Sequence, residues 1–416
     1  MSSKSATTRS WKRNASVFLA SQAVSLLGSS LVQYAIMWYV TLTTKSGAMM
    51  TLSIVCGFGP AFLLSPFAGA FADRHDRKRI IALADAGIAL ATLAVALAFL
   101  AGHKGLWLLF LAQALRAVGS AFHGPAVGAI LPEIVPEDKL MRVGGINGSV
   151  QSAISLVAPL ASGALLSLSS IEAVFFVDVA TAALAIGALL LFLRLPPRGR
   201  PEGRAGVGYF EDLRLGFRYV RGHRYLLSFA AFLGLLFFLV TPAAFLTPLQ
   251  AARRFGPEVW RLTAIEIVFS LGMMGGGALL AAWGGFRNRM RTMVLSTLAM
   301  GLCTLGLGLA PAFWLYLAFM GLFGIAMPLF NTPWSVMLQE HVENDYLGRV
   351  FGVFGMLSSS LMPVSMLLFG PLADLLPIER ILLATGAAML LEGFLALGRP
   401  RLMEAGLPAA RGDGPA

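Results

Sequence analysis

Two charged residues lie inside long apolar stretches, where a charge is unusual. Arg116 lies about ten residues into the stretch that begins near Leu106, and Glu266 lies near the start of the one that begins at Leu262. In the apolar interior of a bilayer an arginine costs about 2.5–3.5 kcal/mol on insertion scales, so Arg116 needs an acidic partner, a water-filled cavity or both. A carboxyl group there can bind and release protons. We therefore expect Glu266 to be the first candidate for a proton site, with a permanent ion pair or a polar brace as the alternative.

Two further acidic residues, Glu392 and Asp178, also lie within apolar stretches. Neither shares a helical face with other polar residues, so both are secondary candidates for a proton-binding site. His123 is seven residues after Arg116. A histidine in this setting can relay protons, but a hydrogen-bonded histidine between packed helices is the more common case.

Other polar residues recur at steps of three and four, which places them on one face of a helix. Faces of this kind point away from lipid, either toward a water-filled cavity or toward a neighbouring helix that they bind by hydrogen bonds. The candidates for lining a cavity are Gln22, Ser25, Ser29, Gln33, Gln113, Ser120, His123, Asn147, Gln151 and Ser270, with Trp334 as a weaker candidate for substrate contact.

The composition requires a membrane protein. Of the 416 residues, 57% are hydrophobic and 13% charged, and twelve apolar stretches are long enough to cross a bilayer as helices. We therefore expect an all-α polytopic protein with no room for a soluble catalytic domain. The expected parts are a cytoplasmic tail at 1–14, a six-helix bundle at 15–193, a cytoplasmic linker at 194–224, a second six-helix bundle at 225–398 and a cytoplasmic tail at 399–416.

The formal net charge of +11 follows the membrane topology. With both termini in the cytoplasm, most of the 32 Lys and Arg residues fall in the inner loops, as the positive-inside rule requires. This distribution argues against nucleic-acid binding. The two cysteines define neither a disulfide framework nor a metal site.

A polar loop occurs twice in the chain. The segment from Glu133 to Gly145 recurs from Glu340 to Gly352, with Glu, Val, Asp, Leu, Arg, Val and Gly in register. The repeat includes Arg142 and its counterpart Arg349. Two related halves, with binding sites expected between them, are typical of secondary transporters.

The loop Gly69-Ala-Phe-Ala-Asp73-Arg74-His-Asp76-Arg77-Lys78-Arg79 resembles the signature loop of the major facilitator superfamily. Closer similarity, to the macrolide-efflux branch of the drug:proton antiporters, lies in the segments that begin at Gln22, Arg116, Glu266 and Tyr346. The resemblance covers essentially the whole chain. It implies the two-bundle fold of that superfamily, and it places Arg116 in or near a central cavity.

The resemblance further implies a network of charges at a cytoplasmic gate. The residues expected in that network are Gly69, Asp73, Arg74, Arg77, Arg79, Asp85, Arg142 and Arg349. For Asp85, one turn into its helix, a simple interfacial ion pair is the alternative. The segment from Ala158 to Gly163 resembles a degraded form of the Gly-Pro-x-x-Gly-Gly motif of drug–proton antiporters.

These features predict a secondary active transporter in the cell membrane that exports small amphipathic compounds, macrolide-like drugs among them, by alternating access and proton antiport. The alternatives are export of an endogenous metabolite such as a siderophore, an uptake carrier, and a non-transporting receptor or scaffold. No nucleotide-binding loop, metal motif or nucleophile–base set occurs in the sequence, so we expect neither an enzyme nor a cofactor. The expected partners are a small-molecule substrate, protons and the lipid bilayer, and the expected state is a monomer.

Overall fold

The computed structural model describes residues 2–193, 209–404 and 406–407, and all regular structure in these ranges is α-helical. The helices follow one another with short connections. In chain order they are α1 (Ser2–Thr44), α2 (Gly47–Arg74), α3 (Arg77–Leu100), α4 (Leu106–Ile134), α5 (Glu137–Leu168), α6 (Ile171–Phe192), α7 (Tyr209–Gly222), α8 (Arg224–Phe245), α9 (Thr247–Arg254), α10 (Val259–Trp283), α11 (Arg289–Leu309), α12 (Phe313–His341), α13 (Asn344–Leu375), α14 (Ile378–Leu397) and α15 (Pro400–Glu404).

Twelve helical segments of the described residues are long and apolar enough to cross a membrane. The shortest, Ile378–Leu397, has 20 residues, which spans about 30 Å at a rise of 1.5 Å per residue. This length matches the hydrocarbon thickness of a bilayer. The prediction of an all-α chain with twelve membrane helices is therefore confirmed.

The chain divides into two compact units. Unit 1 consists of Met1–Thr44 and Leu52–Gly206, and unit 2 consists of Lys45–Thr51 and Val207–Ala416. The first turn of α2 thus belongs to unit 2, whereas the rest of that helix belongs to unit 1. Of the predicted linker 194–224, residues 194–208 lie outside the described residues and the later part forms α7.

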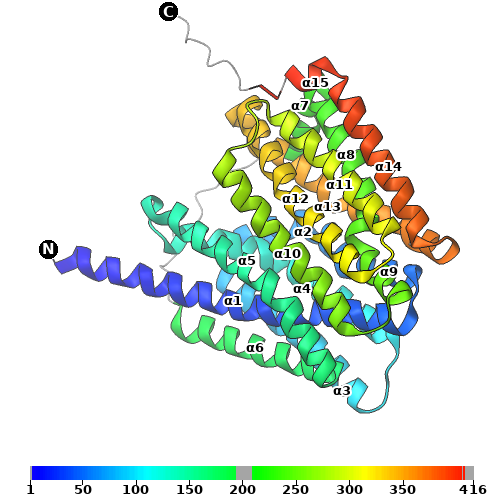
Figure 1. The fold of residues 1–416 in the computed structure, drawn as a ribbon. Helices are drawn as coiled ribbons and strands as arrows, with labels where there is room; N and C mark the ends of the chain where they lie inside the picture. Colours follow the sequence, from blue (N-terminus) through cyan, green and yellow to red (C-terminus); the bar gives the residue numbers. More distant parts are fainter. Residues whose placement is uncertain (1, 194–208, 405, 408–416) are drawn as a thin grey trace, which may run out of the picture. The chain divides into compact units, whose positions relative to one another are not determined.

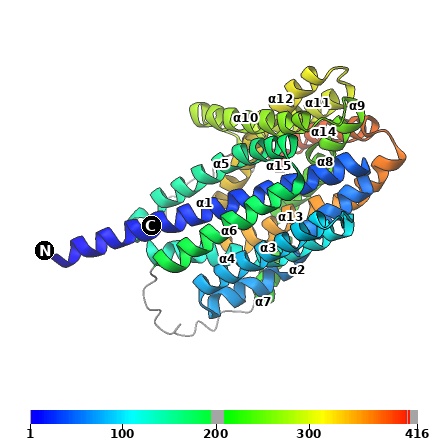
Figure 2. The same cartoon turned by 90° about the horizontal axis from the view of Figure 1, so that it is seen from below.

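Unit 1 is built around α1. This helix packs along α5 and α6 (Figure 1), and α3 packs against α4 and α6 (Figure 2). Apolar side chains fill the space between these helices, including Val32, Phe99, Leu109 and Phe175, each at most 1% exposed. The polar residues discussed below interrupt this apolar packing at a few positions.

Unit 2 pairs α10 with α12 and α11 with α14 (Figure 1). The α10–α12 contact depends on glycine: a Cβ on Gly272 would collide with the carbonyl oxygen of Gly321, and one on Gly276 with that of Ile325. Small residues of this kind allow helix backbones to approach closely in a membrane.

The predicted seventh span, 225–250, is divided into two helices. Helix α8 ends at Phe245, and α9 begins at Thr247 with Pro248 in its first turn. Proline lacks a backbone N–H and clashes with the preceding turn, so it begins a helix more readily than it continues one. Together α8 and α9 cover the 31-residue span Arg224–Arg254.

Candidate functional site

The mid-membrane arginine has an acidic partner within unit 1. Nη1 of Arg116 on α4 donates to Oδ2 of Asp178 on α6 over 2.5 Å, and the two side chains are 11% and 1% exposed. Nη1 also contacts the hydroxyl of Thr92 on α3, and Nη2 donates to the backbone carbonyl of Ser29 on α1 over 3.2 Å. One arginine therefore joins four helices, and its buried charge is compensated.

Asp178 has further polar contacts. It accepts from the hydroxyls of Thr92 over 3.0 Å and Ser29 over 3.5 Å. The helices α1 and α6 come close beside it because Gly28 has no side chain; a Cβ there would collide with Thr181. Asp178 is thus an acceptor for three side chains that come from three helices.

A second polar cluster lies farther along the same helices. Oδ1 of Asp85 on α3 lies 3.3 Å from Nε2 of His123 on α4 and accepts from the hydroxyl of Ser25 on α1 over 3.1 Å. Asp85 and Thr92 are seven residues apart on α3, as are Arg116 and His123 on α4, which corresponds to about 10.5 Å along a helix. We call the two clusters together the polar column.

Asp85 lies in the polar column, and its place in the cytoplasmic charge network stays a prediction. Its contacts in the structure are Ser25 and His123, and it is 4% exposed. Asp85 is eight residues into α3, which packs against α4, and its carboxyl group reaches Ser25 of α1.

The loop between α2 and α3 carries a second set of charges. Nη1 of Arg77 donates to Oε1 of Glu133 and to the carbonyl oxygen of Ala129, both over 2.7 Å, and so ties the start of α3 to the end of α4. Asp76 accepts from the backbone N–H groups of Lys78 and Arg79 and caps the N-terminus of α3. The side chain of Asp73 lies outside the described side chains.

The other expected gate residues have fewer contacts. Arg79 lies 3.5 Å from Asp76, Arg74 and Arg142 are exposed, and a Cβ on Gly69 would have open space around it. Arg349 lies over the ring of Tyr346 at 5.5 Å.

The Arg77–Glu133 ion pair has a counterpart in unit 2. Arg289, the first residue of α11, pairs with Glu340 at the end of α12. Glu133 and Glu340 are the first residues of the two copies of the repeated polar loop. In each unit, therefore, an arginine at the start of the third membrane helix binds a glutamate at the end of the fourth.

Most of the remaining cavity candidates are at least half-buried but do not join the polar column. Gln113 donates to Ser53 over 2.6 Å and links α4 to α2. Ser162 on α5 is fully buried and donates to the carbonyl oxygen of Leu31 over 3.1 Å, so it acts as a contact between helices. Gln33, Ser120 and Gln151 are exposed, whereas Gln22 and Asn147 are half-buried.

The unit 2 candidates lie on several helices. Glu266 is half-buried and Ser270 is buried, both on α10. Trp334 on α12 lies against Phe351 and Phe354 of α13, with ring centroids 6.1 and 6.4 Å away. The roles predicted for Glu266, Ser270 and Trp334 stay predictions.

Glu392 on α14 is the acidic residue with the most unusual setting. It is 6% exposed, and neither carboxyl oxygen has a hydrogen-bond partner among the described residues. The side chain lines a cavity of about 200 Å³ between α8 and α14, with Phe232, Leu235 and Arg399. Burying an unpaired carboxylate is costly, which makes this position a candidate for binding a proton or a cation.

Comparison with known proteins agrees with these observations. Residues 18–366 match the family model of the Major Facilitator Superfamily. Macrolide efflux protein A of Streptococcus pyogenes is 29% identical over 382 residues, covering 91% of this chain and 94% of that protein. The enterobactin exporter EntS of Shigella boydii serotype 4 is 25% identical over 386 residues, covering 92% of this chain and 90% of that one.

Solved structures show the same fold. A crystal structure of the nucleoside transporter NupG has a TM-score of 0.73 at 15% identity and covers 92% of this chain and 98% of its own. The family match over most of the chain, the twelve membrane helices and the shared fold lead to one assignment: the chain belongs to the Major Facilitator Superfamily and is a multi-pass membrane transporter.

Proposed function

We propose that this protein exports small amphipathic compounds, macrolide-like drugs among them, across the cell membrane by alternating access and proton antiport. The observation that carries this proposal is the buried Arg116–Asp178 pair within a chain related over 91% of its length to a macrolide efflux protein. Buried ionisable groups inside membrane helices are costly and are found where ions, protons or substrates pass. Both termini lie in the cytoplasm in this proposal, because that orientation places most basic residues inside.

The polar column is the proposed proton-coupling element. Asp85, His123 and Asp178 are titratable, and the pairing of Asp178 with Arg116 depends on the carboxyl group being ionised. A proton that reaches Asp178 weakens this pair and frees the guanidinium group to interact elsewhere. Loading and release of one proton can thus change the contacts that join α1, α3, α4 and α6.

Glu266 and Glu392 are the proposed coupling candidates in unit 2. Glu392 is the better supported of the two, because its carboxyl group is buried and both oxygens lack hydrogen-bond partners among the described residues. A bound proton offsets the cost of burying this carboxyl group. Glu266, first on sequence grounds, lies half-buried on α10.

The energy of one proton is sufficient for export. Movement of one charge across about 100 mV releases roughly 2.3 kcal/mol, which corresponds to about a fiftyfold concentration ratio for a neutral solute at one-to-one coupling. A single titrating site can therefore support useful efflux.

The proposed cytoplasmic gate uses the paired loops of the repeat. Arg77–Glu133 in unit 1 and Arg289–Glu340 in unit 2 hold the same two helices of each half together. Each half then moves as a rigid body, and the exposed basic residues Arg74, Arg79 and Arg142 remain available for contacts that form only in one state of the transport cycle.

A second candidate function is export of an endogenous metabolite such as a siderophore. The similarity to an enterobactin exporter, over 92% of this chain, favours it specifically. In both candidate functions the protein exports its substrate in exchange for protons, and only the substrate differs.

The test is transport in proteoliposomes that contain the purified full-length protein. With the chain inserted in both orientations, an imposed pH gradient is expected to drive accumulation of a radiolabelled macrolide, and a protonophore is expected to abolish it. Accumulation of a catecholate siderophore with no macrolide transport would select the second candidate. No gradient-dependent movement of either compound would contradict proton-coupled export of these classes.

A further inference from the structure

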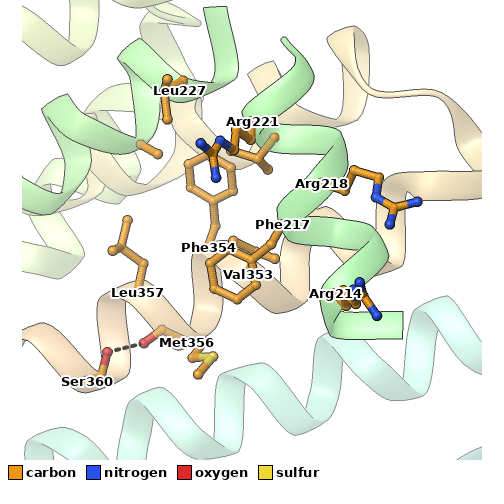
Figure 3. Close-up of a pocket in the computed structure, with 12 residues that line it drawn as sticks. Arg214, Phe217, Arg218, Arg221, Leu227, Val353, Phe354, Met356, Leu357 and Ser360 are labelled. Atoms are coloured by element: carbon orange, nitrogen blue, oxygen red, sulfur yellow. Dashed lines mark hydrogen bonds between the residues drawn. The ribbon is translucent and has the colours of Figure 1, made fainter. Parts of the chain in front are cut away.

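A groove of about 690 Å³ opens within unit 2 where α7 meets α8 and α13 (Figure 3). Two kinds of side chain line it. Arg214, Arg218 and Arg221 come from α7, and apolar side chains of α8 and α13 form the floor. The size is that of a site for a small organic molecule, since such sites measure about 300–1,000 Å³.

The arginines share one face of α7. Their spacing of four and three residues brings them to the same side of the helix. A different face of α7 packs closely against α13. A Cβ on Gly216 would lie 2.8 Å from the carbonyl oxygen of Arg349, and the ring of Tyr219 stacks on that of Tyr346 with centroids 4.5 Å apart. Helix α7 is therefore held in place by contacts that leave the three guanidinium groups exposed.

Among the described side chains, no acidic residue offsets the charge of the groove. None of the ion pairs found among the described side chains involves Arg214, Arg218 or Arg221, and no acidic residue lines the groove. Glu211, one turn before Arg214, forms no described ion pair with it. Ser360, the other polar lining residue, donates to the carbonyl oxygen of Met356 over 2.6 Å. Three arginines without an acidic partner among the described side chains favour an anionic ligand.

The floor of the groove is apolar. Leu227 on α8 is 52% exposed, Phe354 on α13 lies beside Arg221 (Figure 3), and Leu357 on α13 also lines the groove. Leu227 is in the first turn of α8, which begins the membrane span Arg224–Arg254. The arginines therefore lie beside the first residues of the span, and the apolar floor continues from there into the span. The headgroup and acyl chains of a lipid have the same arrangement.

We propose that this groove binds an anionic phospholipid, with its phosphate held by the arginines of α7 and an acyl chain lying along Leu227, Phe354 and Leu357. Guanidinium groups bind phosphate by paired hydrogen bonds, and basic clusters on amphipathic helices at a membrane surface attract anionic lipids. A neutral amphiphile would leave the arginines without a counter-charge, and a free phosphate would leave the floor in contact with water. The site is independent of the transported substrate.

Native mass spectrometry of the full-length protein tests this proposal. The protein is released from vesicles of phosphatidylcholine with and without phosphatidylglycerol, and retained phosphatidylglycerol is counted. One basic contact at a membrane surface corresponds to roughly fivefold in affinity, so the R218Q/R221Q variant is expected to bind about 25-fold more weakly than wild type. The matched control R287Q/R291Q removes two exposed arginines at the start of α11 and is expected to retain the lipid.

Two further measurements separate a lipid site from other occupants. Leu227→Gln is expected to lower retention of phosphatidylglycerol, whereas Leu391→Gln, on an exposed face of α14, is not. Glycerol 3-phosphate, which has the headgroup chemistry without acyl chains, is expected not to displace the lipid. Displacement by it at similar concentrations would make the groove a phosphate site and overturn the proposal.

A stability measurement guards against misfolding. All variants are expected to unfold at the wild-type temperature in phosphatidylcholine, because the changed side chains are exposed. Phosphatidylglycerol is expected to raise the unfolding temperature of wild type and R287Q/R291Q but not of R218Q/R221Q, because a ligand stabilises only the form that binds it. Equal stabilisation of R218Q/R221Q, or equal lipid loss from R287Q/R291Q, would overturn the proposal.

Discussion

Arg116 and Asp178 form a 2.5 Å ion pair between α4 and α6, and each side chain is at least 89% buried. Removal of one partner from a buried pair leaves an uncompensated charge and costs about 3–5 kcal/mol. We therefore expect Arg116→Gln and Asp178→Asn each to lower the unfolding temperature strongly and to abolish export in a transport assay with purified protein.

The double variant R116Q/D178N separates folding from function. With both charges removed, no uncompensated charge remains, so stability is expected to recover in part while export stays absent. Glu258→Gln serves as the control: it breaks a pair with Arg261, the Glu258 side chain is 49% exposed, and the change should cost less than about 1 kcal/mol. Export by R116Q/D178N at the wild-type rate would contradict a role for the pair in coupling.

His123 and Asp85 are expected to shape the pH dependence of transport. Histidine is the side chain that changes charge between about pH 5 and 8, and Nε2 of His123 lies 3.3 Å from Oδ1 of Asp85. We expect His123→Gln to flatten the pH profile of export across this range, because glutamine keeps a polar group without a titrating charge. His103→Gln, in an exposed loop, is the control and should leave the profile unchanged.

The membrane helices and the repeat could be predicted because both can be seen in the sequence without knowing which helices are neighbours. Apolar length identifies each span, and the polar loop at Glu133 recurs in register at Glu340. Arg116 could be singled out for the same reason, since its position inside an apolar run is costly wherever the helix lies. The cost of its charge predicted an acidic partner, a water-filled cavity or both.

The identity of that partner could not be predicted, because it depends on which helices are neighbours. Asp178 lies on α6, which is apolar on all sides apart from a few residues, so no periodicity marks the face that meets Arg116. Asp85 is expected in the cytoplasmic network because it lies one turn into its predicted helix, whereas its contacts with Ser25 and His123 depend on which face of α3 meets the neighbouring helices. For Glu392, only the structure shows that neither carboxyl oxygen has a hydrogen-bond partner among the described residues.

Replacing Arg77 is expected to destabilise unit 1 more than replacing its partner Glu133. Arg77 also donates to the carbonyl oxygen of Ala129, so Arg77→Gln removes two contacts, whereas Glu133→Gln leaves the carbonyl contact in place. We expect Glu133→Gln to cost roughly 1 kcal/mol and Arg77→Gln more, measured by thermal unfolding. Equal effects would show that the carbonyl contact contributes nothing measurable.

The glycines of α10 offer a matched test of close helix packing. A Cβ on Gly276 would collide with the carbonyl oxygen of Ile325 on α12, whereas Gly275 and Gly277 have open space at that position. Overpacking costs about 1–3 kcal/mol, so Gly276→Ala is expected to lower the unfolding temperature. Gly275→Ala and Gly277→Ala are expected to be neutral or stabilising, since alanine favours a helix. A neutral Gly276→Ala would mean that α12 shifts at little cost.

Asp374 is expected to hold the first turn of α2 within unit 2. Its carboxyl oxygens accept from the backbone N–H groups of Gly47 over 2.7 Å and Ala48 over 2.9 Å, and from Arg253 over 2.6 Å. The first N–H groups of a helix have no partner within the helix, so this carboxylate serves as their cap. Asp374→Ala removes all of these acceptors and is expected to cost about 1–3 kcal/mol.

The consequence of the Asp374 contact can be measured at Lys45, beside the capped turn. In a background where Cys56 and Cys303 are replaced by serine, a cysteine introduced by Lys45→Cys is expected to react faster with a maleimide when Asp374→Ala is also present. Glu379→Gln is the control, since it breaks a 3.5 Å pair with Arg254 whose side chains are each 30% exposed. Because α2 continues into unit 1, release of its first turn is expected to change the rate of export as well. An unchanged labelling rate would show that other contacts, such as the hydrogen bond from Thr51 to Met366, are sufficient to hold the turn.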